Sequence, residues 1–160
     1  MKTQYIMSVA LIAVPMIFGQ ADAGEKELKK DQVPKAVISA FEKAFPNAKG
    51  LEFEEELFEG KTTAYEVEYK KDGKEYDFLY SAEGVLLQKE EEIDVKTLPD
   101  PVIQAILKAH PKAKIKEAEK LMKPDSESTV TGYEVEIKVA GKELELELDA
   151  SGKILKTENE

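Results

Sequence analysis

The sequence predicts an α+β fold of two tandem repeats, each with one helix packed on a roughly four-stranded antiparallel sheet. Three observations predict it. The sequence after residue 32 consists of two similar copies. Each copy begins with apolar residues about four positions apart, which is the spacing of one helix face. Apolar and polar residues then alternate with a period of two, which is typical of strands. The 160 residues are 42% apolar, which is enough for a hydrophobic core.

Residues 1–23 are expected to form a signal peptide, followed by an N-terminal segment over residues 24–32. Lys2 supplies the positive charge, residues 6–18 are almost wholly apolar, and Ala21-Asp22-Ala23 has the small-x-small pattern of a cleavage site. The alternative is a membrane anchor, which needs about 20 apolar residues, and the apolar run here is shorter than that. The sequence therefore predicts a periplasmic or secreted protein with no membrane association after cleavage.

The internal repeat sets the expected domain boundaries. Residues 33–40 recur as residues 98–105 with an offset of 65, and Tyr65-Glu66-Val67-Glu68 recurs as Tyr133-Glu134-Val135-Glu136 with an offset of 68. The copies are expected to span residues 33–92 and 93–160, with a joint near residues 91–96. A spacer this short indicates two units held side by side.

Each copy is expected to begin with a helix. In the first copy, Val37, Phe41 and Phe45 form one apolar stripe, and Pro34 suits a first helical turn. Pro46 prevents the helix from continuing beyond Phe45. The second copy keeps the same pattern with Pro99, Val102, Ile106 and Pro111.

Strands are expected after each helix. Asp72-Gly73 is a two-residue hairpin signal, and this turn places Val67 opposite Phe78 and Glu68 opposite Asp77. In the second copy a turn at Ala140-Gly141 produces the equivalent register, although alanine is a poorer residue for positive φ. The outer strands are expected within residues 50–58, 85–88, 115–121 and 154–156.

The order of these motifs resembles the PepSY-like domains grouped with the bacterial β-lactamase-inhibitor protein. The resemblance rests on Phe45-Pro46-x-Ala48, Tyr-Glu-Val-Glu, Gly73-Lys74-Glu75 and Ala82-x-Gly84, and it covers most of residues 33–158 in two copies. These are mainly core and turn positions, so the resemblance implies the fold first. It also implies a non-catalytic, exported, binding or inhibitory module, without naming its target.

The sequence contains few candidates for catalysis. There is no cysteine, no phosphate-binding loop and no nucleophilic serine motif, and the single histidine, His110, is expected to pack or cap at a helix end. Four tyrosines, such as Tyr69 and Tyr76, either form an aromatic platform or belong to the core, and their alternation favours the core. We therefore expect no catalytic residue, no cofactor and no dedicated metal site.

Acidic residues dominate the sheet face opposite the core. Glu136 is expected to face Glu145 and Glu134 to face Glu147, although like charges opposite each other destabilise a sheet. This face is interpreted as a solvated surface, a docking surface for a basic partner, or a loose divalent-cation patch. A tight calcium site is disfavoured, since a sheet is expected to hold carboxylates apart. The partner-binding candidates on this face and the hairpin turn are Glu68, Asp72, Asp77, Leu79, Glu134, Glu136, Glu145 and Glu147.

The charge of the protein indicates which classes of partner it can bind. The formal net charge is −10 and every basic residue is lysine, which argues against nucleic acid as a ligand. The expected function is an exported protein-binding module that inhibits a periplasmic or secreted enzyme, with a basic patch on the partner. The alternatives are a periplasmic binder of cations or small cationic ligands, and a structural component of the envelope.

Overall fold

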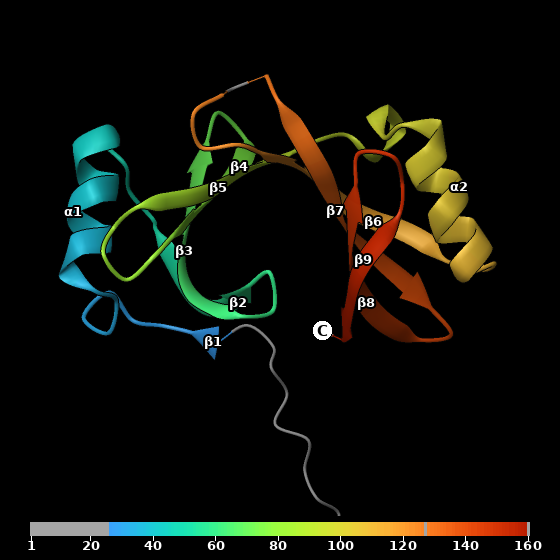
Figure 1. The fold of residues 1–160 in the computed structure, drawn as a ribbon, viewed down its shortest axis with the longest axis horizontal. Coiled ribbons are helices and arrows are strands. Elements are labelled where there is room, and N and C mark those ends of the chain that lie inside the picture. Colours follow the sequence, from blue (N-terminus) through green and yellow to red (C-terminus); the bar gives the residue numbers. More distant parts are fainter. Residues whose placement is uncertain (1–25, 127, 160) are drawn as a thin grey trace, which may run out of the picture.

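Nine strands and two α-helices make up the protein in a computed structural model, which describes residues 26–126 and 128–159 (Figure 1). The expected signal peptide lies outside the described residues. The strands are β1 (Lys26–Glu27), β2 (Glu52–Phe58), β3 (Thr62–Lys71), β4 (Lys74–Tyr80), β5 (Leu86–Glu92), β6 (Lys114–Met122), β7 (Val130–Val139), β8 (Lys142–Asp149) and β9 (Ile154–Asn159). The helices are α1 (Lys35–Ala44) and α2 (Asp100–Ala109), with a short 3₁₀ helix at Val95–Thr97.

All nine strands belong to one antiparallel sheet, and each strand pairs with its neighbours in sequence from β1 to β9. The predicted fold of two tandem helix-on-sheet repeats is therefore wrong. The finding that overturns it is the pairing of β5 with β6, in which Glu90 lies opposite Leu121 and Glu92 opposite Glu119. This ladder joins what were expected to be two separate sheets.

The error has a physical cause in the run of three glutamates at residues 90–92. The repeat boundaries predict a joint near residues 91–96, and glutamates, which are depleted in strands, give no sign that a strand continues into it. In the structure β5 continues to Glu92, and it offers an open edge that β6 covers. Pairing these two edges satisfies backbone groups that two separate sheets would leave unpaired.

The predicted hairpin registers are confirmed. Val67 lies opposite Phe78 and Glu68 opposite Asp77 across β3 and β4. The equivalent pairs across β7 and β8 match as well. Both residues of the first turn have positive φ, at 55° for Asp72 and 80° for Gly73. Ala140 has a φ of 51°, so the second turn forms in spite of its alanine.

The sheet curls, and both helices lie on its outer, convex side (Figure 1). Three of the interruptions in the strand register help the curl, since a bulge bends the strand and increases its twist. They fall at Leu79/Tyr80, Leu121/Met122 and Glu147/Leu148. The concave side is therefore formed by side chains that alternate with those under the helices.

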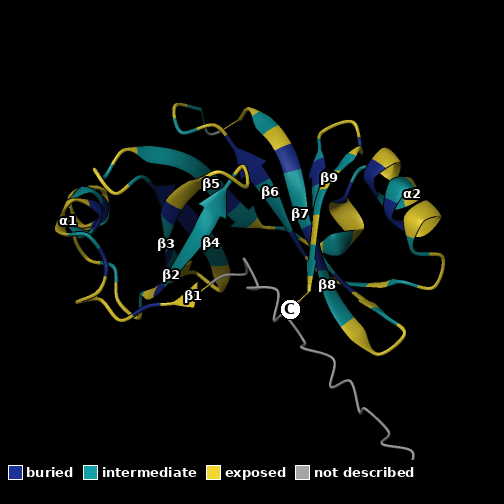
Figure 2. Cartoon of the chain, turned by 60° about the horizontal axis from the view of Figure 1, so that its bottom comes forward, coloured by how far each residue is buried: buried dark blue, intermediate teal, exposed yellow. Residues whose placement is uncertain are grey.

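Two apolar clusters occupy the convex side, one beneath each helix. Val37 and Phe41 of α1 pack with Val67 and Phe78, while α2 packs its own buried residues against β6, β7 and β8. The outer surfaces of both helices are largely exposed, and the strands between them are mostly buried or half-buried (Figure 2). The four tyrosines of the first half pack against its cluster, which confirms that they belong to the core.

The helices begin and end where the prolines predict. Pro34 and Pro99 precede the first residues of α1 and α2, and the backbone N–H of Phe45 donates to the carbonyl of Phe41 at the end of α1. His110 occupies the equivalent position after α2. Among the described residues, the structure contains no helix with the length and apolar character needed to span a membrane.

Two turn glycines fit tightly against the helix starts. A Cβ atom at Gly84 would lie 2.5 Å from the carbonyl oxygen of Ala36, and one at Gly152 would lie 2.6 Å from that of Pro101. Both glycines also have positive φ. The turns after β4 and β8 can therefore pack against α1 and α2 only because these positions carry no side chain.

Gly84→Ala is expected to lower the free energy of unfolding by about 2–3 kcal/mol, from left-handed strain of about 1–2 kcal/mol plus a backbone clash. Gly73→Ala is the matched control, because Gly73 has a φ of 80° and nothing within 4 Å of a Cβ. Urea unfolding of both variants measures the difference. Equal losses would show that the contact between Gly84 and α1 contributes nothing.

Candidate functional site

The concave face of the curled sheet is built from acidic side chains. Period-two alternation places the apolar residues of each strand under a helix and the intervening residues on the opposite side. In β7 and β8 this puts Glu134, Glu136 and Glu145 on the concave face, with Glu136 directly opposite Glu145. The curl brings carboxylates from distant strands closer than a flat sheet would.

Eleven carboxyl groups and one alanine line a hollow of about 180 Å³ in this face, which we call the acidic hollow. It draws on seven strands, from β2 to β8. Its lining residues are Glu54, Glu66, Glu68, Glu75, Asp77, Glu90, Glu117, Ala118, Glu119, Glu134, Glu136 and Glu145.

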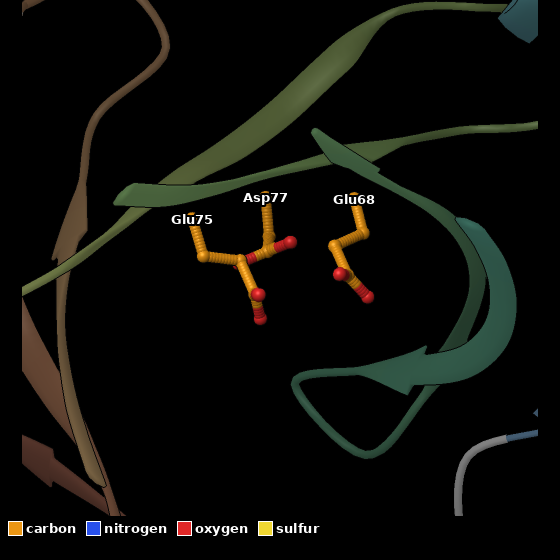
Figure 3. A group of neighbouring side chains, drawn as sticks. All are labelled: Glu68, Glu75 and Asp77. Carbon is orange, nitrogen blue, oxygen red and sulfur yellow. The ribbon is translucent and has the colours of Figure 1, made fainter. Parts of the chain in front are cut away.

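An outer group of three carboxylates lies in the half formed by β3 and β4. Glu68, Glu75 and Asp77 project into the same space beneath β4 (Figure 3), and one oxygen of each lies within 4.8 Å of the others. The Lys70 Nζ atom pairs with Glu75 at 2.7 Å and with Glu68 at 3.0 Å. Part of the negative charge of this outer group is therefore already balanced by an exposed lysine.

An inner group spans the junction between the two halves. Glu90, Glu119 and Glu134, from β5, β6 and β7, also have carboxylate oxygens within 4.8 Å of one another. Carboxyl–carboxyl hydrogen bonds link Asp77 to Glu119 and Glu119 to Glu90. The Gln88 side-chain amide donates to Glu90 at 3.0 Å. Each carboxyl–carboxyl bond requires a shared proton, since two ionised carboxylates are acceptors only.

Burial and repulsion between neighbouring carboxylates raise the pKa values of the buried carboxyl groups in the acidic hollow. Burial, together with the neighbouring carboxylates, raises the pKa of Asp77 to about 8 and that of Glu119 to about 8. Burial also raises the pKa of Glu90 and of Glu134 well above the usual range, with carboxylate repulsion as the second cause. The hollow therefore holds protons near neutral pH, or it attracts another positive charge in their place.

Asp77 has an unsatisfied oxygen. Its side chain is 4% exposed, and its Oδ1 atom receives no hydrogen bond from a donor within the described part of the chain. A buried, unpaired carboxylate oxygen is costly, so each such atom needs an explanation. This oxygen belongs to a residue that lines the acidic hollow.

A second cavity of about 270 Å³ adjoins the acidic hollow, and Glu90 and Glu134 line both. We call it the leucine cavity, because six leucines contribute to its lining. They are Leu57, Leu79, Leu87, Leu121, Leu148 and Leu155. The concave face is thus acidic at one end and partly apolar at the other.

The predicted site residues fall into three places. The acidic hollow contains Glu68, Asp77, Glu134, Glu136 and Glu145. The leucine cavity contains Leu79 and Glu147, and it shares Glu134. Asp72 lies in the exposed turn between β3 and β4 and lines neither cavity. His110 also lines neither.

Three expectations about this face need correction. Leu79 was expected to offer a binding surface to a partner, but it is 2% exposed and is therefore not accessible. Leu155, at 53% exposure, is the accessible leucine of the leucine cavity. The face is not a simple solvated surface, because Asp77 and Glu90 are buried. The curled sheet also brings carboxylates together rather than holding them apart.

Sequence reasoning missed six acidic residues of the acidic hollow. The most important are Glu90 and Glu119, because they lie on the two strands whose pairing was not expected. The signal in the sequence for β6 was the alternation of Glu117 and Glu119 around Ala118, which repeats the pattern of the other strands. The other four are Glu54, Glu66, Glu75 and Glu117.

Comparison with known proteins gives family matches and structural matches. The family described as "Putative beta-lactamase-inhibitor-like, PepSY-like" matches residues 63–156. The family described as "Peptidase propeptide and YPEB domain" matches residues 34–83. No curated protein matches the sequence.

Several solved structures match the chain, and those with a TM-score above 0.5 share its fold. A "putative periplasmic" protein of Bacteroides eggerthii has a TM-score of 0.55 at 13% identity, covering 79% of this chain and 88% of its own. A DUF2874 family protein of Bacteroides uniformis has a TM-score of 0.55 at 15% identity, covering 79% and 89%. A BLIP-like protein of Bacteroides fragilis has a TM-score of 0.49 at 22% identity, covering 79% and 86%.

Proposed function

Since the chain belongs to the PepSY-like, β-lactamase-inhibitor-like family, we propose that it is an exported, non-catalytic module that binds a basic segment of another protein. The binding surface is the concave face of the sheet. The periplasm or the exterior of the cell is the proposed location, in keeping with the description of the Bacteroides eggerthii protein. Inhibition follows if the captured segment borders the active site of an exported enzyme.

The acidic hollow is the observation that carries this proposal. Its described lining consists of eleven carboxyl groups and one alanine, without a lysine or arginine. Lys70 at the rim illustrates the chemistry, because its ammonium group lies between Glu68 and Glu75 and contacts both. A lysine or arginine side chain of a partner can make the same contacts deeper in the hollow.

The leucine cavity adds a second requirement for the partner. It lies next to the acidic hollow, and it includes the exposed Leu155. A segment with an apolar residue near its basic residue can therefore fill both cavities at once. The apolar contact would supply affinity, while the charges would set orientation and association rate.

The experiment measures binding of a labelled peptide of alternating lysine and leucine. A peptide of alternating glutamate and leucine is the matched control. Stopped-flow fluorescence at several salt concentrations gives the association rate. The lysine peptide is expected to associate faster than the glutamate peptide, and its advantage should shrink as salt is added. Salt screens the attraction between exposed charges, which reaches only about 10 Å at 0.1 M. Equal binding of the two peptides would reject the docking role of the acidic hollow.

The double substitution of Glu136 and Glu145 by glutamine is expected to act in opposite directions in two assays. Removing two opposed carboxylates should raise the free energy of unfolding by about 0.2–1 kcal/mol. It should also slow association of the lysine peptide about threefold to tenfold. Thermal or urea unfolding measures the first effect, and stopped-flow fluorescence measures the second.

The matched control replaces Glu42 in α1 and Glu83 in the turn after β4 by glutamine. It removes the same charge, but neither residue lines the acidic hollow. Association slowed equally by both double variants would mean that net charge acts, rather than the hollow. A destabilised Glu136/Glu145 variant would show that these carboxylates make stabilising contacts.

Binding of small cations is a second candidate function. The observation that favours it is the size of the acidic hollow, since about 180 Å³ accommodates a metal ion with water or a single amine group. Thermal unfolding with added spermine or calcium tests it, because a ligand that binds only the folded state raises the midpoint. No change with either ligand would exclude this candidate.

A further inference from the structure

We propose that Glu90, Glu119 and Glu134, together with Asp77, form a specific site for a calcium-like divalent cation. This proposal deepens the second candidate function and rests on it. The site lies where β5 pairs with β6, so its ligands come from both halves of the sheet. It does not depend on the capture of a basic segment.

The spacing of the inner carboxylates fits one ion. One oxygen from each of Glu90, Glu119 and Glu134 lies within 4.8 Å of the other two. Calcium binds oxygen at 2.3–2.6 Å, so two ligands on opposite sides of one ion are about 5 Å apart at most. The three oxygens can therefore contact a single ion with little movement of the strands.

The unsatisfied oxygen of Asp77 is an independent observation that points to the same ligand. Asp77 lies directly opposite Glu90 in the sheet and contacts Glu119 through a carboxyl–carboxyl hydrogen bond. Its Oδ1 atom is buried and receives no hydrogen bond within the described residues. Asp77 lines the same hollow as the inner group, so a cation held there can take this buried oxygen as a further ligand.

The inner group is a better cation site than the outer group, because no lysine in the described part of the chain forms an ion pair with its carboxyl groups. Lys70 already pairs with Glu68 and Glu75. Among the described residues, none of the ion pairs involves Glu90, Glu119 or Glu134. Within residues 26–126 and 128–159, the inner group therefore has no lysine that competes with a cation for its carboxyl groups.

The ligand chemistry favours calcium over smaller or softer ions. All of the candidate ligand atoms are carboxylate oxygens, which suit hard cations. Calcium accepts six to eight oxygen ligands in flexible geometry, whereas magnesium demands a nearly ideal octahedron at 2.0–2.1 Å. The acidic hollow has room for water molecules that complete a calcium shell.

The test compares thermal unfolding of the purified protein in calcium chloride and in magnesium chloride at equal ionic strength. Extracellular calcium modules have dissociation constants of about 10⁻⁴–10⁻³ M. At about 10 mM calcium, the ratio of folded to unfolded protein should therefore rise about 10- to 100-fold. Magnesium should produce a clearly smaller rise.

Two variants separate a specific site from general screening of charge. Replacing Glu119 and Glu134 by glutamine should abolish the calcium effect, while the Glu42/Glu83 double variant should retain it. Equal effects of calcium and magnesium, or a calcium effect that survives in the Glu119/Glu134 variant, would overturn the proposal. If that variant does not fold, calorimetric titration of the unaltered protein with calcium decides, and the absence of saturable binding overturns the site.

The calcium assay and the peptide-binding assay together distinguish failure of this metal site from failure of the proposed docking function. A protein that binds the lysine peptide but shows no calcium effect lacks the metal site and retains the docking function. A protein with a calcium effect and no peptide binding supports the metal site and rejects the docking function.

Discussion

Replacing Phe41 by alanine is expected to lower the free energy of unfolding by about 3–5 kcal/mol. Phe41 is 1% exposed, and its ring lies 5.0 Å from that of Phe45, 5.6 Å from that of Phe78 and 6.0 Å from that of Tyr69, between centroids. The substitution removes the aromatic side chain that connects α1 to β3 and β4. Urea unfolding followed by circular dichroism measures the loss.

The matched control is Leu107→Ala, because Leu107 is a large apolar residue of α2 that is exposed. Its substitution should cost less than about 1 kcal/mol, since little apolar area returns to water. A loss below 1 kcal/mol for Phe41→Ala would contradict the assignment of this ring to the core.

Acidification from pH 8 to pH 5 is expected to stabilise the metal-free protein by several kcal/mol. The pKa values of Asp77 and Glu119 are about 8 in the folded state, against about 4 for unfolded carboxyls. Between these values the folded state binds protons that the unfolded state releases, so stability is greatest at low pH and is lost as pH rises through 8. Each extra proton that the folded state holds contributes about 1.4 kcal/mol per pH unit.

Unfolding in urea with EDTA, measured from pH 5 to pH 8, tests this direction. Exposed carboxyls whose pKa is lowered, such as Glu83 and Asp149, oppose the trend, but solvent keeps their effect small. Asp77→Asn should flatten the dependence, because asparagine does not titrate. Stability that increases from pH 5 to pH 8 would contradict the assignment of protons to the inner carboxyls.

The local structure could be predicted from the sequence because short-range rules determine it. Asp72-Gly73 fixes a two-residue turn, and the turn with the alternation of Val67 and Phe78 fixes the register of β3 and β4. Pro34 and Pro46 mark the limits of α1. Each of these predictions depends on residues that are close together in the sequence.

The pairing of β5 with β6 could not be predicted by the same rules. Glu90 and Glu119 are separated by the whole of α2, and no turn connects their strands directly. Their register depends on the edges that the two halves leave open, and the alternation of charged residues does not specify a partner strand. The prediction of two sheets failed at this step.

The candidate site was predicted only in part for the same reason. Alternation correctly placed Glu136 and Glu145 on the face opposite the core. It could not predict that Asp77 and Glu90 are buried, because their burial results from the curl and from the joining of the halves. The acidic hollow therefore required the structure, although most of its strands were expected.

The two halves of the protein share a backbone ladder but not a hydrophobic core. One apolar cluster contains Phe41 and the other contains Ile106, and the β5–β6 ladder lies between the regions that they stabilise. Such halves are natural cooperative units, each able to open without exposing the core of the other. A cation or basic side chain held by Glu90 and Glu119 would cross-link these units, so occupancy of the acidic hollow would determine whether they exchange amide hydrogens together or separately.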